Sequence, residues 1–149
     1  MPMRLETPLP DLSVVAAWLD SRPSPDDLAG HPVLIYFWSL SCHICHENMP
    51  KLSTWRAMYA PKGLHLVAIH VPRSEEETDL DKVRRAAAEF HVIDPCGLDN
   101  EHALVHAFDN KFLPAYFLFD SEHHLRSRTA GDAGLNLLGD VLKRLFPEE

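Results

Sequence analysis

Cysteine is scarce in this sequence: only three of the 149 residues are cysteine. A framework of several disulfides is therefore excluded, because it would need more cysteine pairs. The chain also lacks an uninterrupted apolar stretch long enough to span a bilayer, and residues 1–6 lack the apolar core of a signal peptide. We therefore expect a cytosolic protein with no membrane partner. The cytosol keeps thiols reduced, so a close cysteine pair there favours catalysis or metal binding over a structural disulfide.

Basic residues are also few, with 14 Lys and Arg against 22 Asp and Glu and a formal net charge of -8. Nucleic acids and anionic lipids are held by clustered basic side chains, so we do not expect nucleic acid as a partner. The acidic run Glu75–Glu77 is typical of a solvated surface, and the sequence assigns it no function. The length suits a single domain, 1–149, with a leader segment at about 1–30 and a core at 31–149.

The apolar pattern predicts an α/β fold. Val33–Trp38 is almost wholly apolar and predicts a central strand buried on both faces. A helix is expected from Cys42 to about Tyr59, with a kink at Pro50. Alternating strands and helices imply parallel pairing, and the last two strands should form an antiparallel hairpin, so the sheet is expected to be mixed. Further strands are expected at 64–71, 96–98, 115–119 and 125–129, and further helices at 81–90, 101–108 and 135–145.

Two of the cysteines, Cys42 and Cys45, lie at the predicted strand-to-helix junction. Cysteines three apart in a first helical turn have Cα atoms about 5.5 Å apart, which suits a disulfide that opens and closes. Because a helix N-terminus favours the thiolate, Cys42, expected to be the more exposed, is the candidate nucleophile. Cys45 would resolve the mixed disulfide, and His43 would tune the pKa of Cys42. Such chemistry needs no cofactor beyond the redox-active disulfide itself.

A metal-binding or copper-delivering module is the main alternative function. Cys42, His43, Cys45 and His46 are all possible ligands, but four ligands from five consecutive helical residues cannot converge on one ion. A second ligand pair is not visible, unless the fold brings the neighbouring histidines at 123 and 124 close, so we predict no metal site. A peroxidase is a weaker alternative, because the threonine and proline that it needs before the cysteine are missing.

The segment Phe37–Cys45, with Pro50 in the next helix and Leu113-Pro114-Ala115-Tyr116 ahead of a late strand, resembles the thioredoxin-like superfamily. The insertion between Val71 and Asn110 is similar to the TlpA and ResA branch. The runs that begin at Val71 and Phe112 are most similar to the cytosolic YkuV-type bacterial enzymes. The resemblance implies a thioredoxin-like α/β fold, in which helices flank a central mixed sheet that carries an αβ insertion.

The resemblance also implies an activity and a substrate site. It implies a thiol-disulfide oxidoreductase that reduces disulfides in proteins or peptides and is recharged by an upstream thiol reductant. Pro114 would be a cis proline facing the cysteine pair, and Leu113 would offer backbone groups to an extended substrate segment. Ser41 would lie near the substrate, although it replaces an aromatic residue that is common in the family. Trp38 would either contact substrate or fill the core between the sheet and the helix.

One expected feature of the family is missing. Relatives often place a buried carboxylate near the deeper cysteine, but the two positions that carry it hold Tyr36 and Asn48 here. Glu47 is the remaining candidate proton acceptor, although the helical rotation of about 100° per residue turns it away from the position of Asn48. The sequence therefore leaves open which group accepts the proton of Cys45.

Overall fold

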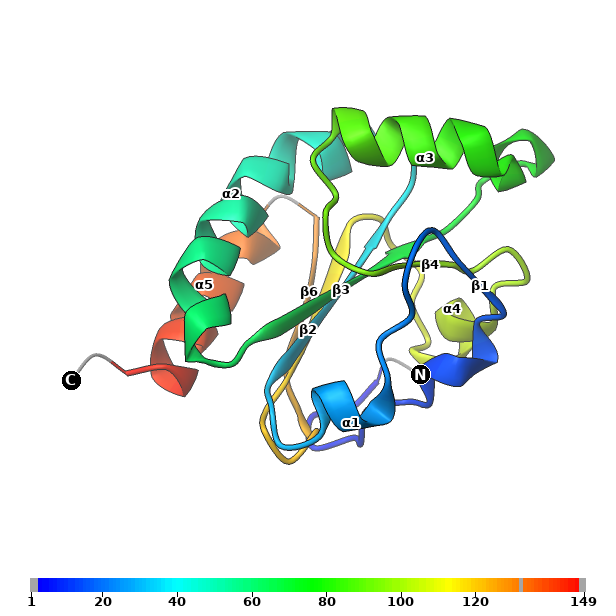
Figure 1. The fold of residues 1–149 in the computed structure, drawn as a ribbon. Coiled ribbons are helices and arrows are strands. Elements are labelled where there is room, and N and C mark those ends of the chain that lie inside the picture. Colours follow the sequence, from blue (N-terminus) through cyan, green and yellow to red (C-terminus); the bar gives the residue numbers. More distant parts are fainter. Residues whose placement is uncertain (1–2, 132, 148–149) are drawn as a thin grey trace.

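The computed structural model describes residues 3–131 and 133–147, and within them the strands form a single twisted sheet flanked by helices (Figure 1). The order of strands across the sheet is β1-β4-β3-β2-β5-β6. The strands are β1 (Ala17–Trp18), β2 (Val33–Trp38), β3 (His65–His70), β4 (Cys96–Leu98), β5 (Ala115–Phe119) and β6 (Leu125–Ala130). The helices are α1 (Pro25–Leu28), α2 (His43–Tyr59), α3 (Leu80–Glu89), α4 (Ala103–Ala107) and α5 (Gly134–Leu145), with 3-10 turns at Leu12–Val14, Ala60–Lys62 and Glu75–Thr78.

The pairing of the strands confirms the predicted mixed sheet. Strand β2 pairs in parallel with β3, and β3 pairs in parallel with β4. On its other side β2 pairs antiparallel with β5, which forms the expected antiparallel hairpin with β6. The carboxyl ends of β2 and β3 therefore lie side by side, which brings the segments that follow Trp38 and His70 together.

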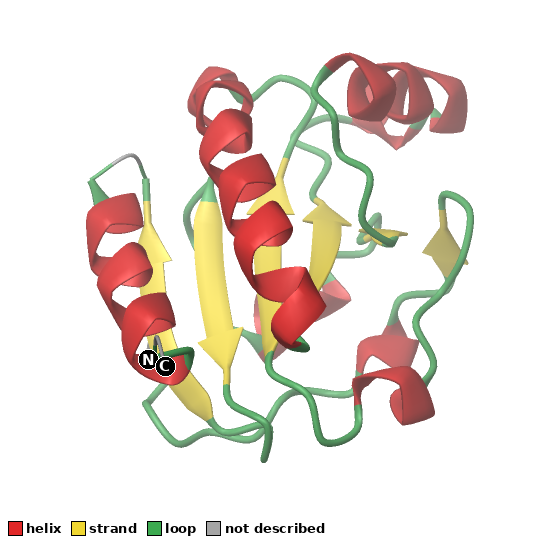
Figure 2. Ribbon diagram, turned by 60° about the vertical axis from the view of Figure 1, so that its left-hand side comes forward, coloured by secondary structure: helices red, strands yellow, loops and turns green. Residues whose placement is uncertain are grey.

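Alternation along β2 divides the core into two layers. Leu34, Tyr36 and Trp38 face a cluster shared with α2, α3 and α5, whereas Val33, Ile35 and Phe37 face a cluster shared with α1 and α4. Figure 2 shows α2 and α5 lying across one face of the sheet. Both faces are covered, which explains why β2 is apolar at every position.

Residues 3–30, within the segment predicted as a leader, pack against the sheet. Strand β1 extends the sheet beside β4, and Met3, Val15 and Leu28 are buried in the second core layer. Helix α1 begins at Pro25. Proline is tolerated at the first helical position because the N–H that it lacks would have no partner in the helix.

Helix α2 carries the cysteine pair and begins and ends where its sequence predicts. Pro50 lies inside the helix, and Gly63, with φ of 109°, closes the 3-10 turn that follows. A left-handed φ of this kind favours glycine, which has no Cβ to clash with the backbone. None of the helices in the described part of the chain has the length and apolar character that a membrane span requires.

Candidate active site

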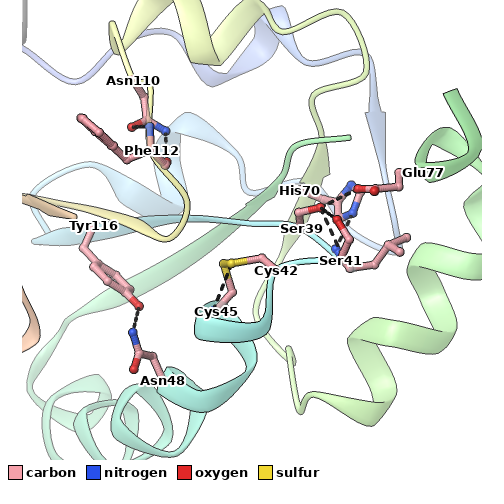
Figure 3. The surroundings of a disulfide bond; sticks show 11 residues. Ser39, Ser41, Cys42, Cys45, Asn48, His70, Glu77, Asn110, Phe112 and Tyr116 are labelled. Atoms are coloured by element: carbon pink, nitrogen blue, oxygen red, sulfur yellow. Dashed lines mark hydrogen bonds between the residues drawn. A yellow bond between two sulfur atoms is a disulfide. The ribbon is translucent and has the colours of Figure 1, made fainter. Parts of the chain in front are cut away.

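Cys42 and Cys45 form a disulfide at the N-terminus of α2, with their Cα atoms 5.3 Å apart (Figure 3). Cys42 is the N-cap residue of the helix, and its Sγ accepts a hydrogen bond from the backbone N–H of Cys45 at 3.1 Å. The first N–H groups of a helix have no partner within the helix, and the helix dipole is positive at this end. The geometry therefore favours negative charge on the Cys42 sulfur once the disulfide is opened.

Both sulfur-bearing residues are almost fully covered. Cys42 is 3% exposed and Cys45 is 1% exposed, so Cys42 is, as expected, the more exposed of the two, but only by a small margin in this oxidised state. The reason is that Cys42 belongs to the core cluster, against which Leu40 and Leu113 also pack. Ser41, directly before Cys42, is exposed, as expected for a residue near a substrate.

The side chains of His43 and Glu47 lie on the outer surface of α2. His43 Nε2 lies 3.0 Å from Glu47 Oε1, and the two side chains are 82% and 58% exposed. His43, which was predicted to tune the pKa of Cys42, thus pairs with Glu47. The structure turns Glu47 toward solvent, while Cys45 lies on the buried face of the same helix, so it does not bring this predicted proton acceptor to Cys45.

The loop before β5 contains the predicted proline. The Leu113–Pro114 peptide bond is cis, as the resemblance implies, and Pro114 is buried while Leu113 is partly buried. The Asn110 side chain shapes this loop, because its Nδ2 donates to the Phe112 carbonyl at 3.0 Å and its Oδ1 accepts the Phe112 N–H at 3.2 Å. The phenyl ring of Phe112 is 65% exposed beside the loop.

Of the two positions expected for Trp38, substrate contact and core, the structure shows the core position. Trp38 is fully buried, and its ring packs edge-on against His70 at a centroid distance of 4.9 Å. A side chain with no exposed surface cannot contact substrate in this conformation, so Trp38 belongs to the core layer under the site. The physical cause is its place on the α2-facing side of the central strand.

A second layer of polar groups lies behind the cysteine pair. The Tyr36 hydroxyl donates to Asp94 Oδ2 at 2.7 Å, and Arg56 pairs with the same carboxylate at 2.5 and 2.9 Å. Burial, together with the nearby Asp94 charge, raises the pKa of Tyr36 well above its ordinary value, so its hydroxyl stays protonated. Asn48 Nδ2 donates to the Tyr116 hydroxyl at 3.1 Å (Figure 3). The sequence did not point to Asp94, which lies in the loop before β4.

The loop before Cys42 contacts Glu77, a residue of the acidic run to which the sequence assigned no function. Glu77 is 8% exposed, and its Oε1 accepts the Ser39 hydroxyl at 2.6 Å (Figure 3). The acidic run was expected to be solvated, which is wrong for this member because the 3-10 turn points it inward. Its place near the site could have been predicted from its position shortly after β3, because the neighbouring parallel strands β2 and β3 end at the same edge of the sheet.

Two further features concern metal ions and the third cysteine. Among the residues that the structure describes, no group of three or more His, Cys, Asp or Glu side chains is arranged to hold a metal ion. Cys96 is buried, and burial raises the pKa of this thiol to about 12. A thiol with this pKa stays protonated at neutral pH.

Comparisons with known proteins agree with this geometry. The model of the Redoxin family matches residues 6–141. The thiol-disulfide oxidoreductase YkuV of Bacillus subtilis (strain 168) is 40% identical over 147 residues, covering 98% of this chain and 99% of the relative. The thiol-disulfide oxidoreductase ResA of Bacillus thuringiensis (strain Al Hakam) is 25% identical over 121 residues, covering 81% of this chain and 67% of the relative. A solution structure of a thioredoxin-like protein in the oxidised form superposes with a TM-score of 0.84 and 40% identity, covering 96% of this chain and 97% of that one.

Proposed function

Since the chain belongs to the Redoxin family and is a thiol-disulfide oxidoreductase with a thioredoxin-like fold, we propose that it reduces disulfides in proteins or peptides. Cys42 is the proposed nucleophile and Cys45 the proposed resolving residue. One observation carries this assignment: Cys42 caps α2, and its sulfur accepts the N–H of Cys45. The sulfur that the helix N-terminus stabilises as a thiolate is the one that attacks first.

The proposed reaction has two exchange steps. The Cys42 thiolate attacks one sulfur of the substrate disulfide, forms a mixed disulfide with it and releases the other substrate sulfur as a thiolate. Cys45 then loses its proton and attacks the Cys42 sulfur, which expels the second substrate sulfur as a thiolate. The substrate gains two electrons and two protons, and the Cys42–Cys45 disulfide seen in the structure is the oxidised product.

The direction and the place of the reaction are part of the proposal. The expected compartment is the cytosol, whose thiol pool keeps exposed dithiols reduced and therefore favours disulfide reduction. The cycle closes when an upstream thiol reductant attacks the Cys42–Cys45 disulfide. The cysteine pair itself carries the electrons in both halves of this cycle.

The proposed substrate contacts lie on both sides of Cys42. The backbone of Leu113, before the buried Pro114, would pair with an extended segment of the substrate, and exposed Ser41 would contact the same segment. His43 is proposed to modulate Cys42 from the surface, where its ring is already paired with Glu47. The support for this arrangement is that Leu113 packs against the same cluster that contains both cysteines.

Serine variants of the two cysteines test these roles. With reduced protein and insulin as substrate, Cys45→Ser should accumulate a covalent mixed disulfide at Cys42, because nothing resolves it. Cys42→Ser should form no adduct and lose insulin reduction. Mass spectrometry of the intact protein detects the adduct. Cys96→Ala serves as the control, because its buried thiol takes no part and the variant should reduce insulin like the wild type. Failure of Cys45→Ser to trap any substrate, while the wild type reduces insulin, would contradict the assigned roles.

A further inference from the structure

The loop Ser39–Ser41, which leads from β2 into Cys42, is held by a side chain at the end of β3 and by one from the 3-10 turn that follows. His70 Nε2 accepts the backbone N–H of Leu40 at 3.2 Å. Glu77 Oε1 accepts the hydroxyl of Ser39 at 2.6 Å and also the backbone N–H of Arg73 at 3.1 Å. Figure 3 shows Ser39, His70 and Glu77 gathered on the side of the disulfide opposite Asn48 and Tyr116.

Ser39 connects these anchoring side chains to the backbone of Cys42. Its hydroxyl oxygen lies 3.4 Å from the N–H of Ser41, which donates to it, and its carbonyl accepts the N–H of Cys42 at 3.0 Å. The carboxylate of Glu77 is therefore linked by one serine residue to the backbone of the nucleophile. A change at Glu77 should move the loop, and with it the Cys42 sulfur relative to the first turn of α2.

The electrostatics of this anchor are unusual for a residue with so little exposure. Burial alone would raise the pKa of Glu77, but the hydrogen bonds from Ser39 and from the Arg73 N–H outweigh it and hold the pKa below its ordinary value. Burial also lowers the pKa of His70 to about 4, so this facing imidazole is neutral at pH 7. Arg73 is exposed and binds Glu77 through its backbone, and the other acids of the turn, Glu75 and Glu76, are exposed.

Within this described network, Glu77 therefore keeps a negative charge beside the loop Ser39–Ser41. A neutral acceptor could accept the same two hydrogen bonds, so the charge is not needed for the anchoring alone. A nearby anion opposes a thiolate, in contrast to the N-terminus of α2, which favours it. In a dithiol-disulfide couple, whatever disfavours the thiolate disfavours the reduced form and strengthens the reductant. The direction of this effect agrees with a protein that reduces disulfides.

We propose that Glu77 is a positioning residue of the active site, which fixes the loop Ser39–Ser41 and, through its charge, makes the Cys42–Cys45 dithiol a stronger reductant. This inference rests on the exchange chemistry proposed above. Glu77 touches neither sulfur in the contacts described, so it acts through Ser39 and through the field at Cys42 rather than in the exchange itself.

Glu77→Gln tests the proposal, and Glu76→Gln is its matched control, because it removes an exposed carboxylate from the same turn. Two properties are measured: the redox equilibrium of the cysteine pair with glutathione, and the pH dependence of Cys42 alkylation by iodoacetamide. For Glu77→Gln we expect an equilibrium shifted about tenfold toward the dithiol, which is about 30 mV less negative, and alkylation with a midpoint at lower pH. Glu76→Gln should stay within about twofold of the wild type.

Wild-type values of both properties in a Glu77→Gln protein with an unchanged thermal transition would overturn the proposal. Equal shifts in both glutamine variants would also overturn it, because net charge alone would then explain the effect. Should Glu77→Gln not fold, Ser39→Ala keeps the charge and removes the link, and its exchange with glutathione should slow severalfold; a wild-type rate would refute the anchoring. Neither measurement uses a protein substrate, so a failure of insulin reduction remains a separate result.

Discussion

The two cysteines of the site have contrasting surroundings. Next to Cys42, the loop is anchored by the buried, ionised Glu77. On the side of Cys45, the polar groups include the Asn48 amide, which lies one helical turn after Cys45 and is bonded to Tyr116, and the protonated hydroxyl of Tyr36, whose side chain shares a core cluster with Cys45. A carboxylate is present in this second region too, but Asp94 is already bound by Arg56 and by Tyr36.

This contrast separates two demands on the site. Cys42 must be a thiolate before any substrate arrives, so its surroundings set how strong a reductant the protein is. Cys45 reacts only after the mixed disulfide has formed, and the described groups behind it serve mainly to pair Tyr36, Arg56 and Asp94 with one another. We therefore expect substitutions behind Cys45 to change stability, and substitutions beside Cys42 to change redox behaviour.

The largest expected effect is the loss of stability in Asp94→Ala. This change leaves the partly buried Arg56 without its carboxylate partner and removes the acceptor of the Tyr36 hydroxyl, with side chains 16% exposed for Arg56 and 9% for Asp94. Each lost hydrogen bond to a charged group costs about 1.5–3 kcal/mol, so with two donor side chains affected the free energy of unfolding should fall by about 3 kcal/mol or more. Urea unfolding measures it, and the alkylation profile of Cys42 in the folded variant should match the wild type.

The matched control is Asp20→Ala, which breaks the exposed ion pair with Arg84 and should cost less than about 1 kcal/mol. If Asp94→Ala were as stable as Asp20→Ala, the partly buried pair of Arg56 and Asp94 would not stabilise the second layer. If instead it shifted the midpoint of Cys42 alkylation, the division between a stabilising and a redox-tuning region would fail.

The next effect is a change in the pH dependence of stability in His70→Gln. Burial lowers the pKa of His70 to about 4 in the folded protein, against 6.5 in the unfolded chain. The unfolded chain therefore binds the proton first, and the folded state loses stability as the pH falls from about 6.5 to about 4, by about 3 kcal/mol in all. Gln has no such titration, and its Oε1 can still accept the Leu40 N–H.

Urea unfolding of wild type and variant between pH 7 and about pH 4.5 measures this difference. His65→Gln is the comparison, because burial lowers the pKa of His65 as well, but this side chain is only partly buried. It should flatten the pH dependence less than His70→Gln. Parallel curves for wild type and His70→Gln would show that the imidazole under the loop titrates normally, and would weaken the picture of a neutral His70 facing Glu77.

The sequence predicted the elements that depend on the local pattern of apolar residues. The apolar run Val33–Trp38 and the periodicity after Cys42 placed β2, α2 and the cysteine pair correctly. It could not predict which of three consecutive glutamates points inward, because Glu77 differs from its neighbours only in its direction on a single 3-10 turn. The burial of Cys42 escaped it for a similar reason, since the packing of Leu113 against the same core cluster comes from a loop about 70 residues away.

The smallest expected effect concerns the proton of Cys45, and it is tested by Asn48→Asp. Position 48 lies one helical turn after Cys45 and is 4% exposed, so an aspartate there would place a carboxyl group beside the deeper cysteine. Burial should raise the pKa of this carboxyl toward neutrality, where it can accept the proton of Cys45. We expect resolution to be about tenfold faster, equivalent to ~1.4 kcal/mol of activation free energy.

Reduced protein is mixed with the disulfide of thionitrobenzoate in a stopped-flow instrument. Attack by Cys42 releases the first coloured thiol, and attack by Cys45 on the resulting mixed disulfide releases the second, whose rate is the rate of resolution. Glu47→Gln is the decisive companion, because it removes the carboxylate one residue earlier, which faces solvent and pairs with His43. If it leaves the rate unchanged while Asn48→Asp raises it, position 48 is where an acid can reach Cys45. A slower release in Glu47→Gln, with a shifted pH profile, would instead make Glu47 the acceptor and would erase the contrast between a charged flank at Cys42 and a neutral one at Cys45.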